Sequence, residues 1–128
     1  MDNMDNTETQ EVNSAFQKGK QAYSKKLFVE AVKWLSDAAE AGHAKAQYYL
    51  GLCFFHGGFG IKQDDEKALK WIRKAAEAGC YEAQDMLGDM YNHGWGVPYD
   101  AYEAYQWYVK SGNTAEADEL LRVHQMMQ

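Results

Sequence analysis

The chain has 128 residues, of which 46% are hydrophobic and 25% charged, a composition typical of one globular domain rather than a disordered segment. Its formal net charge of −6 argues against nucleic acid as a partner, because phosphate binding requires clustered Lys and Arg. No stretch is long and apolar enough to span a membrane.

The N-terminal segment is acidic and carries no basic residue before Lys18. We expect residues 1–12 to form a disordered acidic tail and residues 13–128 to form a single domain. The segment also lacks the basic start and apolar run of a signal peptide. We therefore expect a cytoplasmic protein in which Cys53 and Cys80 are free thiols.

The first predicted unit covers residues 14–42. Small and apolar residues recur there at steps of three and four, which predicts two amphipathic helices. A short turn from Ser24 to Leu27 separates them. The residues of this pattern are Ala15, Gly19, Ala22, Phe28, Ala31, Leu35 and Ala38.

The next two units, residues 44–79 and 81–112, repeat one another. The segment 46–57 reads Ala-Gln-x-x-Leu-Gly-x-x-aromatic-x-His-Gly and recurs 37 residues further on, at 83–94. Gly58 is a one-residue insertion, after which the spacing becomes 36. Such a period indicates a repeat architecture.

Each of these units predicts a helix, a glycine-rich loop and a second helix. Asp64 and Asp100 are suited to cap the second helices, and Asp100 forms a capping-box pattern with Glu103. The second helices share a tryptophan, Trp71 in one unit and Trp107 in the other.

Residues 114–127 predict one more helix, preceded by a possible capping box of Asn113 and Glu116. A stacked array requires its last open face to be covered, so we expect a C-terminal capping helix. The chain as a whole predicts an all-α fold with about seven helices, a right-handed α-solenoid of antiparallel two-helix repeats.

The repeated pattern resembles the Sel-one-like repeat family, a relative of the tetratricopeptide repeats. It reads Ala-x-x-x-Leu-Gly-x-x-Tyr-x-x-Gly-x-Gly-Val, followed by Asp-x-x-x-Ala-x-x-Trp-x-x-Lys. The resemblance covers residues 44–113 as two units. Residues 14–42 resemble a tetratricopeptide unit more closely, through Gly19, Phe28 and Ala31. The resemblance implies an adaptor for other proteins.

No residue pattern predicts catalysis, a metal site or a cofactor. His56 and His93 occupy equivalent places in adjacent repeats, but helices packed 8–10 Å apart hold such residues too far apart to share one zinc ion. Asp64, Asp65 and Glu66 stand where acidic residues favour a helix N-terminus. We therefore expect a protein that is not an enzyme.

The predicted partner-binding surface lies on the first helices, which line the inner face of a curved stack. Its positions are apolar residues and methionines rimmed by polar groups, which suits an extended peptide or a partner helix. An alternative is that the apolar members pack between neighbouring repeats. The residues are Gln17, Lys20, Gln21, Tyr49, Leu52, His56, Met86, Asp89, Met90, His93, Arg122 and Met126.

A second candidate surface is aromatic and lies on the loops and the start of the last second helix. Aromatic residues are favoured interface anchors, although packing against the terminal helix is the alternative. The residues are Phe59, Trp95, Tyr99, Tyr102 and Tyr105.

The leading hypothesis is a non-catalytic adaptor or regulator that binds a protein or peptide on its concave face. One alternative is an immunity-type inhibitor that covers the basic active site of a toxin or enzyme. A homo-oligomeric scaffold is also open. A β-lactamase-like hydrolase, as linked to cysteine-rich secreted members of the family, has little support, because this chain has two cysteines and no secretion signal.

Overall fold

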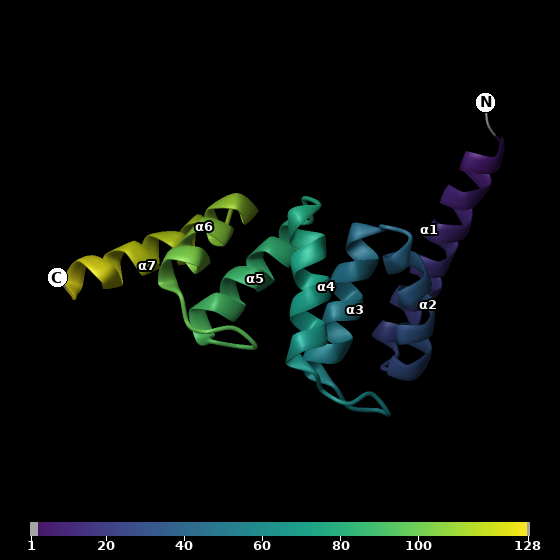
Figure 1. Ribbon diagram of the computed structural model, residues 1–128, viewed down its shortest axis with the longest axis horizontal. Coiled ribbons are helices and arrows are strands. Elements are labelled where there is room, and N and C mark those ends of the chain that lie inside the picture. The colour runs from purple at the N-terminus through teal and green to yellow at the C-terminus, as the bar shows by residue number, and fades with distance from the viewer. Residues whose placement is uncertain (1–2, 128) are drawn as a thin grey trace.

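The computed structural model describes residues 3–127, and every helix or strand assigned in that range is a helix (Figure 1). The seven helices are α1 (Asn3–Ser24), α2 (Phe28–Glu40), α3 (Ala44–His56), α4 (Asp65–Glu77), α5 (Tyr81–His93), α6 (Ala101–Ser111) and α7 (Thr114–Met126). Extended pairing within the described residues is limited to one isolated bridge between Gly58 and Ile61.

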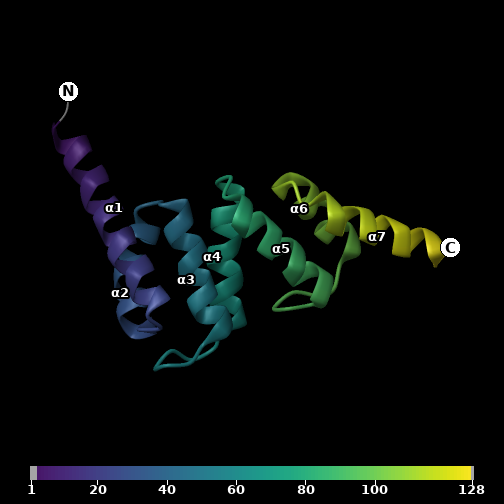
Figure 2. The ribbon, with the colours of Figure 1, turned by 180° about the vertical axis from the view of Figure 1, so that it is seen from behind.

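The helices form a row of hairpins along the long axis of the molecule. The hairpins α1–α2, α3–α4 and α5–α6 follow one another from one end to the other, and α7 extends beyond the last of them (Figures 1 and 2). Each second helix also contacts the first helix of the next hairpin. The predicted all-helical solenoid is therefore confirmed.

Glycines allow the two helices of each hairpin to approach closely. A Cβ atom on Gly51 would lie 2.7 Å from side-chain atoms of Ile72, and one on Gly88 would lie 2.7 Å from the ring of Tyr108. Gly19 has the same relation to Leu35 in the first hairpin. The shared glycine therefore sets the spacing of the hairpins.

The tryptophan of each second helix packs toward the preceding hairpin. Trp71 contacts the buried cluster of the first hairpin and α3, whereas Trp107 lies in the cluster around Ile72 and Leu87. Trp34, the equivalent residue of α2, is half-buried. Trp71 and Trp107 thus occupy equivalent places in successive seams.

The predicted N-caps are present. The Asp64, Asp100 and Asn113 side chains accept hydrogen bonds from the third backbone amide that follows each of them. The reciprocal half of a capping box is absent at Asp100 and Asn113 because their own amides are used elsewhere. They donate to the carbonyl oxygens of Tyr91 and Tyr108.

The prediction of a disordered tail at 1–12 differs from the structure, because α1 begins at Asn3. The segment contains no proline or glycine that would interrupt a helix, and it continues directly into the buried Ala15 and Phe16. At 22 residues α1 is much longer than α2, with 13, and it projects past the row (Figure 1). Residues 1 and 2 lie outside the described part of the chain.

Candidate binding surface

The first helices α1, α3 and α5 present equivalent residues at the surface. Their positions follow the one-turn and two-turn steps that place residues on one face of a helix. Exposed members are Gln17, Lys20, Gln21, His56 and His93, and half-buried members are Tyr49, Leu52, Met86 and Asp89. We call the face formed by these nine residues the first-helix surface.

An aromatic cluster supports this surface between α1 and α3. The ring of Tyr49 lies 5.2 Å from that of Tyr23 and 6.0 Å from that of Phe16. Phe16 stacks on His43 at 4.4 Å. Tyr49 is therefore held by neighbouring rings, and its position is set before any partner arrives.

Tyr48 lies beside Tyr49, with the ring centroids 5.4 Å apart, and packs toward the α4–α5 seam. Burial raises the pKa of Tyr48 to about 12. Its phenol therefore stays neutral at physiological pH. Tyr48 and Tyr49 are adjacent on α3, and they pack into the helix interfaces on its two sides, Tyr49 toward α1 and Tyr48 toward α4 and α5.

Polar contacts link α5 to the helices around it, both within its own hairpin and beyond it. Lys45 of α3 forms an ion pair of 2.8 Å with Glu82 of α5. The hydroxyl of Tyr108 donates to the Asp89 carboxylate at 2.6 Å, and Asn113 donates to Asp85 at 2.6 Å. These carboxylates are committed within the protein and offer a partner only their remaining lone pairs.

The environment of Asp89 is partly desolvated. Burial raises the pKa of the Asp89 carboxyl group, although the hydrogen bond from Tyr108 opposes that effect. Asp89 therefore contributes to the packing of α5 against α6, in addition to any contact with a partner.

The inclusion of Met90 in the predicted surface is wrong. Met90 has 0% exposure and belongs to the cluster formed with Leu87 and Trp107. The equivalent Cys53 is also buried. Gln21, at the same position in α1, is exposed.

Arg122 and Met126 lie on α7, whose packing is chiefly against α6. Both are exposed. Arg122 pairs with Glu119 and also donates to the sulfur of Met126, at 3.4 Å. These two residues extend the predicted surface onto the terminal helix.

The predicted aromatic patch is divided among several places. Phe59 packs edge-on against Phe28 of α2, at 5.5 Å, and Trp95 stacks on His93 while also contacting Phe55 of α3. The loop rings thus reach back to the preceding hairpin.

The remaining members of the patch lie near α6. Tyr99 and Tyr102 are 64% and 68% exposed, whereas Tyr105 is half-buried near Leu120. The alternative of packing against the terminal helix therefore holds for Tyr105. Tyr102 remains available to another molecule.

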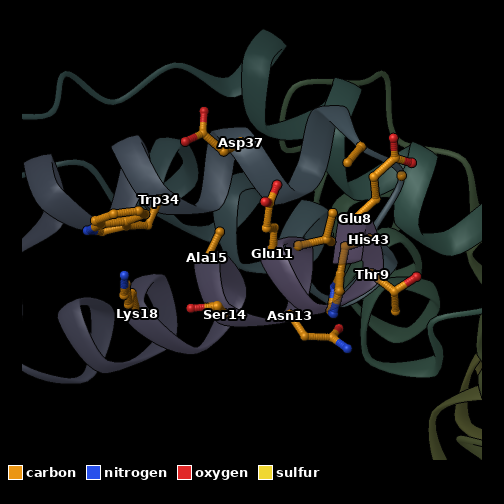
Figure 3. Close-up of a pocket in the computed structure, with 13 residues that line it drawn as sticks. Glu8, Thr9, Glu11, Asn13, Ser14, Ala15, Lys18, Trp34, Asp37 and His43 are labelled. Atoms are coloured by element: carbon orange, nitrogen blue, oxygen red, sulfur yellow. The ribbon is translucent and has the colours of Figure 1, made fainter. Parts of the chain in front are cut away.

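A cleft of about 760 Å³ opens where α1 projects past α2 (Figure 3). The indole of Trp34 forms one wall, with the ammonium group of Lys18 4.5 Å from the ring centroid. The carboxylates of Glu8, Glu11 and Asp37 also line the cleft. The charge of the cleft is therefore mostly negative.

The sequence analysis did not identify this cleft. Trp34 was a usable signal, because it occupies the position of Trp71 and Trp107. The cleft is where a preceding hairpin would cover that tryptophan, and it depends on the extension of α1 that the sequence analysis missed.

The two cysteines are free. Cys53 is buried, and desolvation raises its pKa to about 12. Cys80 is half-buried, and its pKa is also raised, mainly by desolvation. Both thiols are therefore protonated at neutral pH, the form in which a thiol is a poor nucleophile.

Metal-binding clusters and membrane spans are both absent from residues 3–127. No group of three or more His, Cys, Asp or Glu side chains in that range is arranged to hold a metal ion. Within the same range, no helix has the length and hydropathy needed to cross a bilayer.

Stacked helical hairpins with a continuous face of first helices define an α-solenoid repeat protein. The Sel1 repeat model matches residues 14–43, 44–80 and 82–113. The chain belongs to the Sel1 repeat family. The first unit, which we expected to be closer to a tetratricopeptide unit, is thus also matched as a Sel1 repeat.

Two solved structures are similar to this chain. One is c5321, a protective antigen of uropathogenic Escherichia coli strains described as displaying an SLR fold, with 28% identity and a TM-score of 0.78 over 95% of this chain and 27% of that one. The other is a Sel1 repeat protein from Oxalobacter formigenes, with 31% identity and a TM-score of 0.74 over 91% of this chain and 47% of that one.

This chain therefore spans less than half the length of either protein. The comparison with curated proteins found no match. Sel1 repeat proteins generally act as protein-interaction modules.

Proposed function

We propose that this chain is a non-catalytic binding module that holds a partner protein on the first-helix surface. The observation that carries the proposal is the row of exposed and half-buried side chains on α1, α3 and α5, supported by the aromatic cluster around Tyr49. A rigid, partly apolar face lowers the ordering cost of binding.

The partner segment is an extended peptide or a helix with apolar side chains. Leu52 and Met86 are half-buried, so a partner side chain placed over them completes their burial. Lys20, His56 and His93 are exposed polar residues of the same first helices. A polar rim around an apolar centre is the usual arrangement at protein interfaces.

A non-catalytic role agrees with the physical origin of the shifted pKa values. Asp89 shares a hydrogen bond with Tyr108, and Cys53 is buried in the seam beside α1. Each of these shifts follows from packing between helices. We also propose a cytoplasmic location, which the two free thiols support.

The test is an affinity pull-down with the wild type and the double variant Leu52→Arg/Met86→Arg. The wild type is expected to retain a partner, and the double variant is expected to lose it, because two buried cations would then face the partner. Val29→Arg is the matched control, since Val29 is 57% exposed on the second helix α2. Circular dichroism establishes that all three proteins are folded. Equal retention by both variants contradicts the proposal.

A second candidate function is inhibition of a basic protein, favoured by the acidic cleft beside Trp34. Glu8, Glu11 and Asp37 would receive a cationic side chain, and the net charge of −6 would speed association with a basic partner. Under this proposal Glu11→Lys/Asp37→Lys abolishes binding while the first-helix variants do not. Binding that is insensitive to both salt and this double change contradicts it.

A further inference from the structure

Two turn residues of the stack have a backbone conformation that is unfavourable for residues with a side chain. Lys26 has a φ of 61° and Phe59 a φ of 51°, and these are the two non-glycine residues with a positive φ in the range 3–127. The residues that follow α3 and α5 also have a positive φ, but both are glycines. A bulky residue in this conformation is rare, and such strain is concentrated at functional positions.

Phe59 lies at the tip of a tight turn in the α3–α4 loop. Gly58 and Ile61 exchange two backbone hydrogen bonds, of 2.7 and 3.1 Å. Phe59 and Gly60 between them both have a positive φ, as in a type I′ turn, where glycine, asparagine and aspartate predominate. The Phe59 ring contacts Phe28 but is still 68% exposed. Burial within the chain therefore does not explain a phenylalanine at this position.

The α1–α2 turn and the α3–α4 loop lie at the same edge of the stack (Figures 1 and 2). The loop approaches α2 closely, because a Cβ atom on Gly60 would lie 2.7 Å from a side-chain carbon of Val29. Leu27 in the turn is 48% exposed. We call the exposed residues of this turn and loop the turn-edge patch, which consists of Lys25, Lys26, Leu27, Phe59 and Lys62.

The turn-edge patch is cationic in a protein that is acidic as a whole. Residues 12–29 contain four lysines and no acidic residue, and residues 57–63 contain Lys62 and no acidic residue, whereas the net charge of the chain is −6. Within residues 3–127, no ion pair involves Lys25, Lys26 or Lys62. These three ammonium groups are therefore available to an anionic partner.

The acidic groups of the chain do not neutralise this patch. Glu8, near the start of α1, precedes Ser24 by 16 residues, about 24 Å along the helix, which exceeds the screening length of about 8 Å at physiological ionic strength. Glu30 and Asp64 follow the two lysine-bearing segments directly, and the Asp64 carboxylate already accepts a hydrogen bond from the Lys67 amide. The cationic character is therefore local to the turn and the loop.

We propose that the turn-edge patch binds an acidic segment of a partner protein that carries an aliphatic or aromatic side chain. That side chain covers Leu27 and Phe59, and the carboxylates beside it pair with Lys25, Lys26 and Lys62, which surround an apolar centre with charge. The patch lies on a turn and a loop, outside the first-helix surface. The proposal is therefore independent of the function proposed above.

An anionic membrane matches the patch less well than a protein segment does. A bilayer is flat and would face the whole edge of the stack, which includes Glu66 at the start of α4 and Asp100 in the α5–α6 loop (Figure 1). Both residues are exposed, and the negative surface potential of anionic lipids would repel them. A peptide segment is narrow enough to contact the patch alone.

The first experiment measures binding of fluorescent synthetic peptides by anisotropy. The probe is the acidic peptide Glu-Asp-Glu-Leu-Phe-Glu-Asp-Glu, and the control is the same peptide with lysine at every acidic position. The acidic peptide is expected to bind saturably and more weakly as salt is added, and the basic peptide is expected not to bind. Equal binding of both peptides overturns the proposal. Binding to phosphatidylserine vesicles without binding to the acidic peptide also overturns it.

The second experiment reverses charges in the patch. Lys25→Glu/Lys26→Glu is expected to weaken binding of the acidic peptide by about tenfold or more. Lys70→Glu/Lys74→Glu is the matched control, because it makes the same change in net charge at two exposed lysines of α4. It is expected to bind like the wild type. Equal weakening by both double variants would mean that net charge alone is responsible, and it overturns the assignment to the patch.

The third experiment separates binding from folding. Lys26→Gly and Phe59→Asn place residues that tolerate a positive φ at the two strained positions. Their urea midpoints are expected to equal or exceed that of the wild type, while their affinity for the acidic peptide falls by about threefold or more. Leu52→Arg/Met86→Arg, on the first-helix surface, is expected to bind the peptide at least as tightly as the wild type. Wild-type affinity in Phe59→Asn overturns the proposal.

Discussion

Gly88 shows how one missing side chain controls the separation of two helices. An alanine in the interior of a helix is ordinarily more favourable than glycine by up to about 1 kcal/mol. At this position the added Cβ would instead meet the Tyr108 ring at 2.7 Å. The ring is rigid, fully buried and hydrogen-bonded to Asp89, so it cannot easily move away.

We therefore predict that Gly88→Ala destabilises the protein by roughly 1–3 kcal/mol, as overpacking of a core usually does. Urea unfolding measures the change in the free energy of unfolding. Gly51→Ala provides the comparison, because its nearest atoms belong to the flexible end of Ile72, and we expect a smaller loss there. A gain in stability for Gly88→Ala would show that helix propensity outweighs packing at this seam.

The same dependence on neighbours explains which single residues could be predicted from the sequence. The shared glycines and tryptophans recur at fixed spacing, so their equivalence was visible. The burial of Met90 could not be predicted in this way, because Met90 is covered by α4, the second helix of the preceding hairpin. Gln21 stands at the same position and is exposed. Periodicity alone therefore could not separate a surface position from a seam position.

At the scale of the element, local signals determine where most helices begin. Asp64 and Asp100 were predicted as caps, and both accept the expected backbone hydrogen bonds. The start of α1 was missed because neither a cap nor a breaker marks it, and an acidic composition alone was taken to indicate disorder. The sequence thus predicted the hairpins well, but it did not predict the cleft beside Trp34.

We predict that Asp100→Ala costs about 1 kcal/mol, the usual value for loss of an N-cap. The change removes the acceptor for the Glu103 amide at 3.1 Å. Asp100→Asn retains an acceptor oxygen and should stay close to the wild type. Chemical denaturation of the three proteins measures the difference, and an equal loss in both variants would mean that charge, not capping, is responsible.

At the scale of the whole molecule, the stack is elongated and each hairpin depends on its neighbours. The interior hairpin α3–α4 has a hairpin on both sides, whereas α7 packs chiefly against α6. Local opening costs least where few apolar groups are buried. Stability should therefore decline from the middle of the stack toward α7.

Hydrogen–deuterium exchange on dilute protein measures this gradient. We expect the slowest exchange in α3 and α4 and the fastest helical exchange in α7, where Ala117 is the single buried residue. Protection in α7 equal to that in α3 under monomeric conditions would contradict this order.

The loop rings have a consequence for how such an array can be rearranged. The Phe59 ring contacts Phe28, and the Trp95 ring contacts Phe55. The aromatic ring of each loop therefore packs on a residue of the preceding hairpin. If a hairpin were moved to another protein, the aromatic ring of its loop would lose the residue that it packs against. A unit exchanged by recombination therefore has to include both the loop ring and the residue that it packs against. Such a unit crosses the boundary between two sequence repeats.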